Sequence, residues 1–138
     1  MGVDYGERRI GLALSDPTAT IASPLPTVKR RRGKRPPVEA LSRLAEEREA
    51  VEIVVGLPLA LDGSESPWTL EVRRFGERLA ERTGLPVFWI DERLTSVEAE
   101  RAVRSVGLPK SRREEKGRVD AAAATLILQR HLDRRGRA

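Results

Sequence analysis

Carboxylates stand at three points where the surrounding sequence predicts burial. Asp4 lies in the first apolar segment, Asp91 and Glu92 directly follow the apolar run LPVFWI, and Asp120 precedes a run of four alanines. A carboxylate in such a place costs free energy unless it is paired or bound to a cation. Each also has an ordinary structural interpretation, as a strand-end acceptor, a solvated loop residue or an acid near a helix amino terminus. Considered together, the three positions indicate a site.

The residue types indicate the chemistry of that site. In open α/β sheets, sites lie outside the carboxyl ends of the strands, so one parallel sheet would bring these acidic segments together. The chain has no cysteine and a single histidine, His131, for which we expect a structural or solvated role. Converging carboxylates then favour Mg²⁺ or Mn²⁺. Two such ions about 3.5–4 Å apart can hold the attacking water and the leaving oxygen of a phosphodiester.

Basic residues flank each of these acids and form one dense run. The segment 29–35, KRRRGKR, predicts an arm that binds nucleic acid with salt-dependent, sequence-independent affinity, although a solvated loop is the alternative. A net charge of +5 and a pI of about 10.4 also favour a polyanionic partner. The candidate nucleic-acid-binding residues are Arg8, Arg9, Lys29, Arg30, Arg31, Arg32, Lys34, Arg35, Arg93, Lys116 and Arg118.

The elements that must position these residues follow from the apolar pattern. Two short strands at the amino terminus read as a hairpin, and a third strand carries Pro24 and Pro26, which confine it to a sheet edge. Ser66 followed by Pro67 starts one helix, and Thr95 with Glu98 forms a capping box for another. The expected strands are 1–5, 9–15, 21–28, 51–56 and 85–90, and the expected helices are 36–50, 67–83, 95–106 and 118–135.

This order predicts one domain, 1–138, built as a mixed five-stranded sheet with helices on both faces. It is the order of the ribonuclease-H-like architecture. The small residues Gly11, Ala13 and Ser15 share one face of the second strand, so a helix could approach that face closely. The four alanines after Asp120 would let the last helix do so, and residues 109–116 are expected to form a polar loop before it.

Composition limits the setting in which the protein works. No run reaches the roughly 18 apolar residues of a membrane span, and the amino terminus lacks a signal-peptide pattern, so we expect a cytoplasmic protein with no membrane partner. The chain has no asparagine, one glutamine, and 22 arginines against 4 lysines. Avoidance of thermolabile side chains is typical of thermophiles, so the composition predicts a thermostable protein.

Four blocks together resemble the YqgF family, also called RuvX, of Holliday junction resolvases and pre-16S rRNA nucleases. They are VDYGERRIGLALSD at 3–16, IVVGLPLALDGSES at 53–66, DERLTSVEAE at 91–100 and KGRVDAAAATLILQRHL at 116–132, in the family's order. The resemblance implies metal-dependent cleavage of structured RNA, such as the 5′ end of pre-16S rRNA, or of branched DNA.

Carried over residue by residue, the family's acidic positions fall on Asp4, Glu92 and Asp120. We expect Asp4 to be the bridging ligand of Mg²⁺ or Mn²⁺, with Glu92 and Asp120 completing the catalytic site and Asp91 as the alternative to Glu92. In RuvC-like nucleases an acid ends the strand that corresponds to EIVVG, whereas Gly56 stands there in this chain. The carboxylate of the next strand would have to take its place.

Two other functions remain open at this point. A non-catalytic RNA-binding factor in ribosome assembly or transcription could retain the same fold, and its binding would depend on salt and not on metal. The stretch DYGERRIGLA at 4–13 also resembles the phosphate-binding hairpin of actin-like kinases, but those need two such domains to enclose a nucleotide. A junction resolvase would act as a homodimer, whereas a precursor nuclease could act as a monomer.

Overall fold

The sheet has five strands in the order β3-β2-β1-β4-β5. The computed structural model describes the backbone of residues 1–30, 34–94 and 112–136, and the side chains of these residues except 94 and 112–120. The expected helix at 95–106 and its capping box therefore lie outside the described residues. The elements are β1 Gly2–Tyr5, β2 Arg9–Ser15, β3 Ala22–Lys29, α1 Val38–Glu47, β4 Ile53–Leu57, α2 Pro67–Thr83, β5 Val87–Asp91, η1 Glu92–Leu94 and α4 Arg112–Gly136.

The pairing of the strands confirms the predicted mixed sheet. β1 and β2 form the expected antiparallel hairpin, and β3 pairs with β2 at the edge of the sheet. The prolines of β3 are tolerated there, because an edge strand does not need every backbone N–H for pairing. β1, β4 and β5 run parallel, in a register that pairs Val3 with Val55 and Gly56 with Ile90. The carboxyl ends of these three strands therefore meet at one edge of the sheet.

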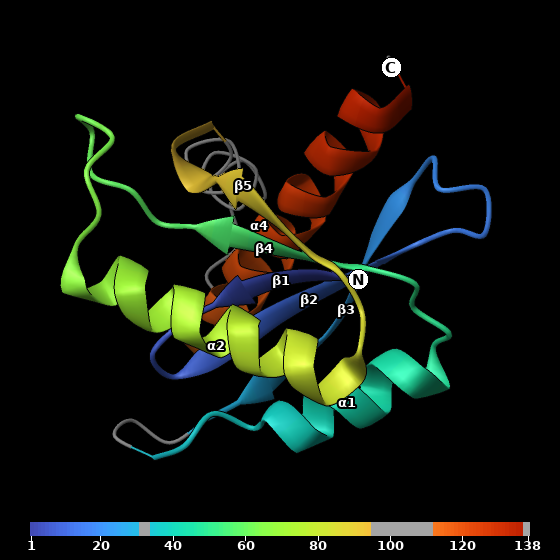
Figure 1. Ribbon diagram of the computed structural model, residues 1–138, viewed down its shortest axis with the longest axis horizontal. Helices are drawn as coiled ribbons and strands as arrows, with labels where there is room; N and C mark the ends of the chain where they lie inside the picture. The colour runs from blue at the N-terminus through green and yellow to red at the C-terminus, as the bar shows by residue number, and fades with distance from the viewer. Residues whose placement is uncertain (31–33, 95–111, 137–138) are drawn as a thin grey trace.

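Helices cover both faces of this sheet (Figure 1). The sides of α1 and α2 that face the sheet close one core around Leu41, Val72 and Phe75. α4 closes a second core on the opposite face, with Ile127 and Leu128 as its largest buried side chains. Among the described residues, no helix is long and apolar enough to cross a membrane.

The ends of α2 show how local sequence sets the element boundaries. The Ser66 hydroxyl accepts a hydrogen bond from the backbone N–H of Thr69, and Pro67 occupies the first helical position, as predicted. Gly84 ends the helix in the left-handed region with φ 71°, which glycine adopts at no steric cost.

The last helix approaches the sheet as closely as its small residues allow. A Cβ built on Gly2 would lie 2.7 Å from the Leu128 Cβ and 2.8 Å from the Ala124 carbonyl oxygen, so only glycine fits there. The predicted start of this helix at 118 is wrong, because α4 begins at Arg112. Residues 112–116 are arginine, glutamate and lysine, all good helix formers, so this described part of the expected loop belongs to the helix.

Candidate active site

Asp4 and Glu92 meet at the carboxyl ends of the parallel strands. Asp4 lies two residues after Gly2, so strand alternation turns it to the same face of the sheet, the face that α4 covers. Glu92 follows β5 directly and opens η1, and its side chain is hydrogen-bonded to that of Asp4. The structure thus brings together two of the three predicted acids, from segments 88 residues apart in sequence.

Gly56 makes room for this contact. A Cβ built on Gly56 would lie 2.6 Å from Oε1 of Glu92, 2.8 Å from its Cγ and 2.5 Å from Cδ1 of Ile127. The register of β1 with β4 sets Gly56 beside Asp4 on the same face. The glutamate of β5 therefore occupies the space above the end of β4. Sequence reasoning recognised that β4 lacks an acid but missed that the glycine itself is required.

Burial shapes the electrostatics of the pair. It raises the pKa of Asp4 well above its usual range, and the hydrogen bond and the charge of Glu92 raise it further. Burial also raises the pKa of Glu92, against the opposing effect of the hydrogen bond from Asp4, while the charge of Asp91 adds to the rise. Ionising both of two carboxyls in contact costs free energy, because the two negative charges repel each other. The pair therefore holds a proton to a higher pH than isolated carboxyls do. A divalent cation could replace that proton.

Asp91 has a different environment, although it is the next residue in the chain. Its two carboxylate oxygens accept hydrogen bonds from the Arg93 guanidinium, at 2.9 and 2.6 Å for Oδ2 and 3.0 Å for Oδ1. These contacts hold the pKa of Asp91 below its ordinary value. Strand alternation explains the difference, because Asp91 and Glu92 leave β5 toward opposite faces. Of the two acids, the structure places Glu92 against Asp4.

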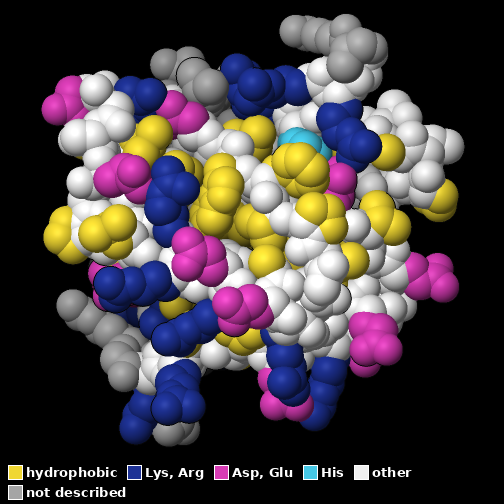
Figure 2. Space-filling model, in the orientation of Figure 1, with side chains coloured by type: hydrophobic (Ala, Val, Ile, Leu, Met, Phe, Trp, Pro, Cys, Tyr) yellow, Lys and Arg dark blue, Asp and Glu magenta, His cyan; other side chains and the backbone are white. Residues whose placement is uncertain are grey.

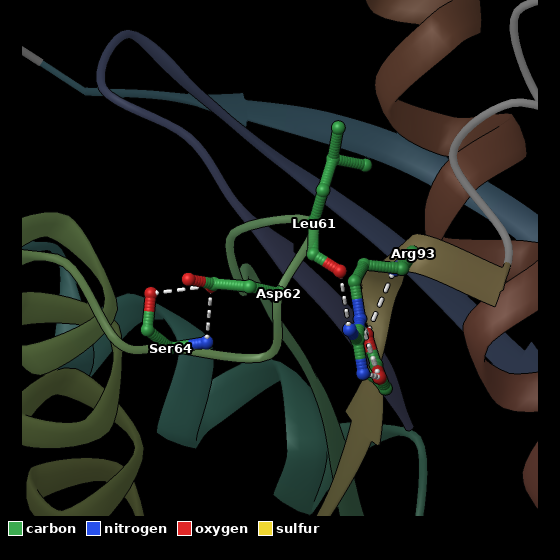
Figure 3. A network of polar contacts seen from close by, with 5 residues as sticks. Leu61, Asp62, Ser64 and Arg93 are labelled. Atoms are coloured by element: carbon green, nitrogen blue, oxygen red, sulfur yellow. Dashed lines mark hydrogen bonds and ion pairs between the residues drawn. The ribbon is translucent and has the colours of Figure 1, made fainter.

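Arg93 fastens the loop after β4 to the end of β5. Its second terminal nitrogen donates to the Leu61 carbonyl oxygen at 3.0 Å, and the neighbouring Asp62 caps the turn by accepting from the Ser64 backbone N–H and hydroxyl (Figure 3). This guanidinium, predicted to bind nucleic acid, is thus engaged with protein groups. Arg93 thus links the loop after β4 to the end of β5, and both segments lie beside the acidic pair.

Asp120 belongs to α4, as predicted, but its side chain lies outside the described part. Ala123 and Ala124, three and four residues later in the helix, are buried against the sheet. Among the described residues no group of three acids, histidines or cysteines gathers to hold a metal. The donor set of Asp4 and Glu92 nevertheless suits Mg²⁺ or Mn²⁺, which take oxygen ligands and complete their shell with water and phosphate.

The predicted cations lie mostly on the surface around this edge of the sheet. Arg8 is exposed in the β1–β2 turn and Arg9 is half-buried at the start of β2. Lys29 ends β3, and Lys34 and Arg35 are exposed beyond it. Arg31, Arg32 and the side chains of Lys116 and Arg118 lie outside the description. His131, the single histidine, is buried and contacts Glu52 at 2.9 Å, which is the structural role expected for it.

Comparison with known proteins gives one consistent answer. The family model described as "RuvX: Holliday junction resolvase" matches residues 1–134. Curated relatives carry the name "Putative pre-16S rRNA nuclease". One from Chloroflexus aurantiacus is 43% identical and covers 98% of this chain and 86% of its own. Others from Anaeromyxobacter dehalogenans and Koribacter versatilis are 45% and 46% identical, cover 98% and 99% of this chain, and are themselves covered to 96% and 87%.

A likeness among solved structures supports the fold independently. Thermus thermophilus RuvC in complex with a Holliday junction substrate superposes with a TM-score of 0.57 at 16% identity, over 98% of this chain and 94% of that one. At this identity the match concerns the fold alone. It confirms the ribonuclease-H-like, RuvC-like architecture predicted from the order of the elements.

Proposed function

Because this chain belongs to the RuvX family of nucleases, we propose that it is a metal-dependent endonuclease that hydrolyses phosphodiesters in structured nucleic acid. The observation that carries the proposal is the contact between the half-buried side chains of Asp4 and Glu92, at the carboxyl ends of β1 and β5. A carboxyl pair withdrawn from water in this way contributes little to folding, since it must hold a proton to be tolerated. Such a pair is favourable when a divalent cation binds both carboxylates and replaces the proton.

In this proposal Asp4, Glu92 and Asp120 hold Mg²⁺ or Mn²⁺. The ion, when bound, supplies positive charge for the scissile phosphate and an acidified water as the nucleophile. The protein residues position it: β1 and β5 fix two carboxylates on one face, and α4 brings the segment of Asp120 to that face. In hydrolysis the water oxygen bonds to phosphorus, the bond to the leaving sugar oxygen breaks, and that oxygen takes up a proton.

The names of the relatives suggest pre-16S rRNA as a substrate, and the description of the family suggests the Holliday junction, a branched DNA. Both are structured polyanions, which suits a basic protein whose cations surround the acidic edge. Resolution of a branched DNA needs two cuts related by symmetry, so activity on that substrate implies two copies of the chain. Trimming of an RNA precursor needs only one.

A cleavage assay on both substrates tests the proposal. Wild type is compared with Asp4→Asn and Glu92→Gln, each with Mg²⁺, with Mn²⁺ and with a chelator. We expect cleavage that requires the ion and falls by at least roughly a hundredfold in either variant, since each loses an oxygen ligand. Asp133→Asn is the matched control, because among the described residues this exposed acid of α4 contacts only Gln129, from which it accepts a hydrogen bond.

The outcomes separate the two functions that the sequence leaves open. Metal-dependent cleavage that both variants lose supports the endonuclease. If wild type binds the RNA tightly, responds to salt but cleaves neither substrate with any ion, the protein is a binding factor and the proposal is wrong. Circular dichroism of each variant shows that any loss of cleavage occurs in folded protein.

A further inference from the structure

A recess lies on the opposite face of the sheet from the Asp4–Glu92 pair. It has a volume of about 630 Å³ and is bordered by residues 5 and 7 at the β1–β2 turn, by residues 30, 34 and 36 beyond β3, and by α2 from residue 67 to residue 78. Tyr5 is part of its wall and directly follows Asp4, so the recess and the acidic pair share the same end of β1. Strand alternation turns the two side chains to opposite faces.

Four cations from two separate segments line this recess: Arg30 and Lys34 beyond β3, and Arg74 and Arg78 on α2. Arg74 and Arg78 are one helical turn apart, and within the described residues neither they nor Lys34 forms an ion pair. Two acids, Glu7 and Glu71, also line it, so the cations remain in excess. Figure 2 shows several Lys and Arg side chains at the lower left of this face, with Asp and Glu side chains among them.

Arg30 is held in place by the backbone. Its terminal nitrogens donate to the carbonyl oxygens of Gly6 at 3.3 Å and Lys34 at 3.5 Å, and its guanidinium carbon lies 4.6 Å from the centre of the Tyr5 ring. Its Nε is buried and has no hydrogen-bond partner among the described residues. Each terminal nitrogen carries a second N–H, so a guanidinium positioned in this way can still donate to a phosphate oxygen supplied by a ligand.

Aromatic rings form the floor of the recess. The ring of Tyr5 is stacked against Phe75, with centroids 4.0 Å apart, and against Trp68, with centroids 5.5 Å apart and planes 9° from parallel. Tyr5 and Phe75 are buried, whereas Trp68 keeps part of its surface in solvent. An aromatic surface bordered by arginines is the combination with which proteins hold unpaired nucleotides, by stacking on bases and by charge on phosphates.

We propose that this recess, which we call the Trp68 pocket, binds unpaired nucleotides of the same nucleic acid that the acidic pair would cut. The inference rests on the proposed function. A pocket of this volume accepts a ligand of nucleotide size and excludes a duplex. Its place at the carboxyl end of β1 lets a single strand pass from one face of the sheet to the other. The Trp68 pocket would thereby select substrates with a single-stranded extension beside the paired region.

Binding is measured with a chelator present, so that no cleavage is required. A labelled stem-loop with a single-stranded extension is compared with the same stem-loop lacking it, by fluorescence anisotropy. Wild type should prefer the extended form, and Arg74→Gln/Arg78→Gln should lose roughly tenfold in affinity for that form alone. Arg43→Gln/Arg82→Gln is the control: it removes the same charge from two arginines that pair with Glu39, away from the pocket.

A spectroscopic arm reports on the aromatic floor. In Trp89→Phe the fluorescence comes from Trp68 alone, since the chain has two tryptophans. A single-stranded oligonucleotide should quench it, and a free mononucleotide should do so at least roughly tenfold more weakly, because it lacks neighbouring phosphates. If the mononucleotide binds equally well, the pocket takes free nucleotides and the proposal is overturned.

Failure of this inference can be told from failure of the proposed function. The proposal is wrong if Arg74→Gln/Arg78→Gln still prefers the extended stem-loop. It is also wrong if this variant loses the same affinity for both stem-loops. The cleavage assay with metal on wild type decides the endonuclease separately. A protein that cleaves but shows no preference for the extension keeps the proposed function and loses this inference.

Discussion

The side chain of Glu92 occupies the space that any side chain on Gly56 would need: a Cβ there would lie 2.6 Å from Oε1 of the glutamate. The end of β4 can therefore carry its own side chain or admit the carboxylate of β5, but not both. This relationship explains why an acidic site can form at a strand end that has no acid.

Gly56→Ala should lower the cleavage rate roughly a hundredfold while leaving the protein folded. The new methyl group must displace Glu92 or Ile127, and misplacement of a ligand by about 1 Å can cost roughly a hundredfold in rate. Overpacking should also lower the free energy of unfolding by about 1–3 kcal/mol. Cleavage rates and thermal melts measure the two effects.

A double variant separates the two contacts of Gly56. Ile127→Val removes the Cδ1 atom that lies 2.5 Å from the built Cβ, so in Gly56→Ala/Ile127→Val stability should partly recover while cleavage stays low. Gly136→Ala is the control, because nothing lies within 4 Å of its Cβ position. Recovery of full cleavage in the double variant would show that Glu92 does not depend on Gly56.

The acidic pair should make the protein less stable as the pH rises when no cation is bound. The folded state raises the pKa of both carboxyls, so it holds a proton that the unfolded chain releases above about pH 4. The free energy of unfolding therefore falls as the pH rises from that value through the folded pKa. Thermal melts with a chelator at about pH 5 and about pH 7.5 measure the fall.

Asp4→Asn should be more stable than wild type at the higher pH under these conditions, because it removes one of the two charges. Other groups titrate in both proteins alike, so the difference between the two melting curves isolates the pair. Added Mn²⁺ should raise the melting temperature of wild type and not of Asp4→Asn. A difference between the curves that does not vary with pH would refute the shared proton.

The sequence predicted much of this fold because the strongest signals are local. The Ser66 cap, the Gly84 stop and the prolines of β3 act within a few residues, and each forms where it was expected. The choice between Asp91 and Glu92 could not be made locally. The run LPVFWI is apolar at every position, so alternation shows that the two acids point apart but not which one faces α4. The role of Gly56 depends on a side chain 36 residues later in the chain.

Glu52 should stabilise the opposite end of the molecule without affecting cleavage. Its Oε1 contacts His131 Nε2 at 2.9 Å and Arg135 at 2.5 Å, which joins α4 to the start of β4. Burial alone would raise its pKa, but the hydrogen bonds and charges of these partners lower it overall. Its contribution is therefore present above the unfolded pKa of about 4.5 and is lost as the pH falls through the lower folded value.

Glu52→Gln should lower the free energy of unfolding by about 1–3 kcal/mol near neutral pH, since it leaves Arg135 and His131 without their carboxylate partner. Urea unfolding measures this, with Glu46→Gln as the control, because Glu46 is exposed and makes no ion pair among the described residues. Equal stabilities of the two variants would mean that the contacts of Glu52 contribute nothing net.

Arg93 should affect catalysis through position and not through binding of nucleic acid. Its guanidinium is occupied by both oxygens of Asp91 and by the Leu61 carbonyl, beside Glu92. Arg93→Lys cannot reproduce the two-pronged contact, so the loop after β4 and the end of β5 should shift relative to each other. We expect the cleavage rate to fall by roughly tenfold while the affinity for the substrate, measured with a chelator, stays near the wild-type value.

Two further variants complete the test of Arg93. Arg8→Gln removes an exposed cation of the β1–β2 turn and should weaken binding with little change in the rate at saturating substrate. Asp91→Asn combined with Arg93→Lys should lower the cleavage rate little more than either change alone, because both break the same contact. If Arg93→Lys instead weakens binding as much as Arg8→Gln and leaves the rate unchanged, Arg93 contacts the nucleic acid and not only Asp91.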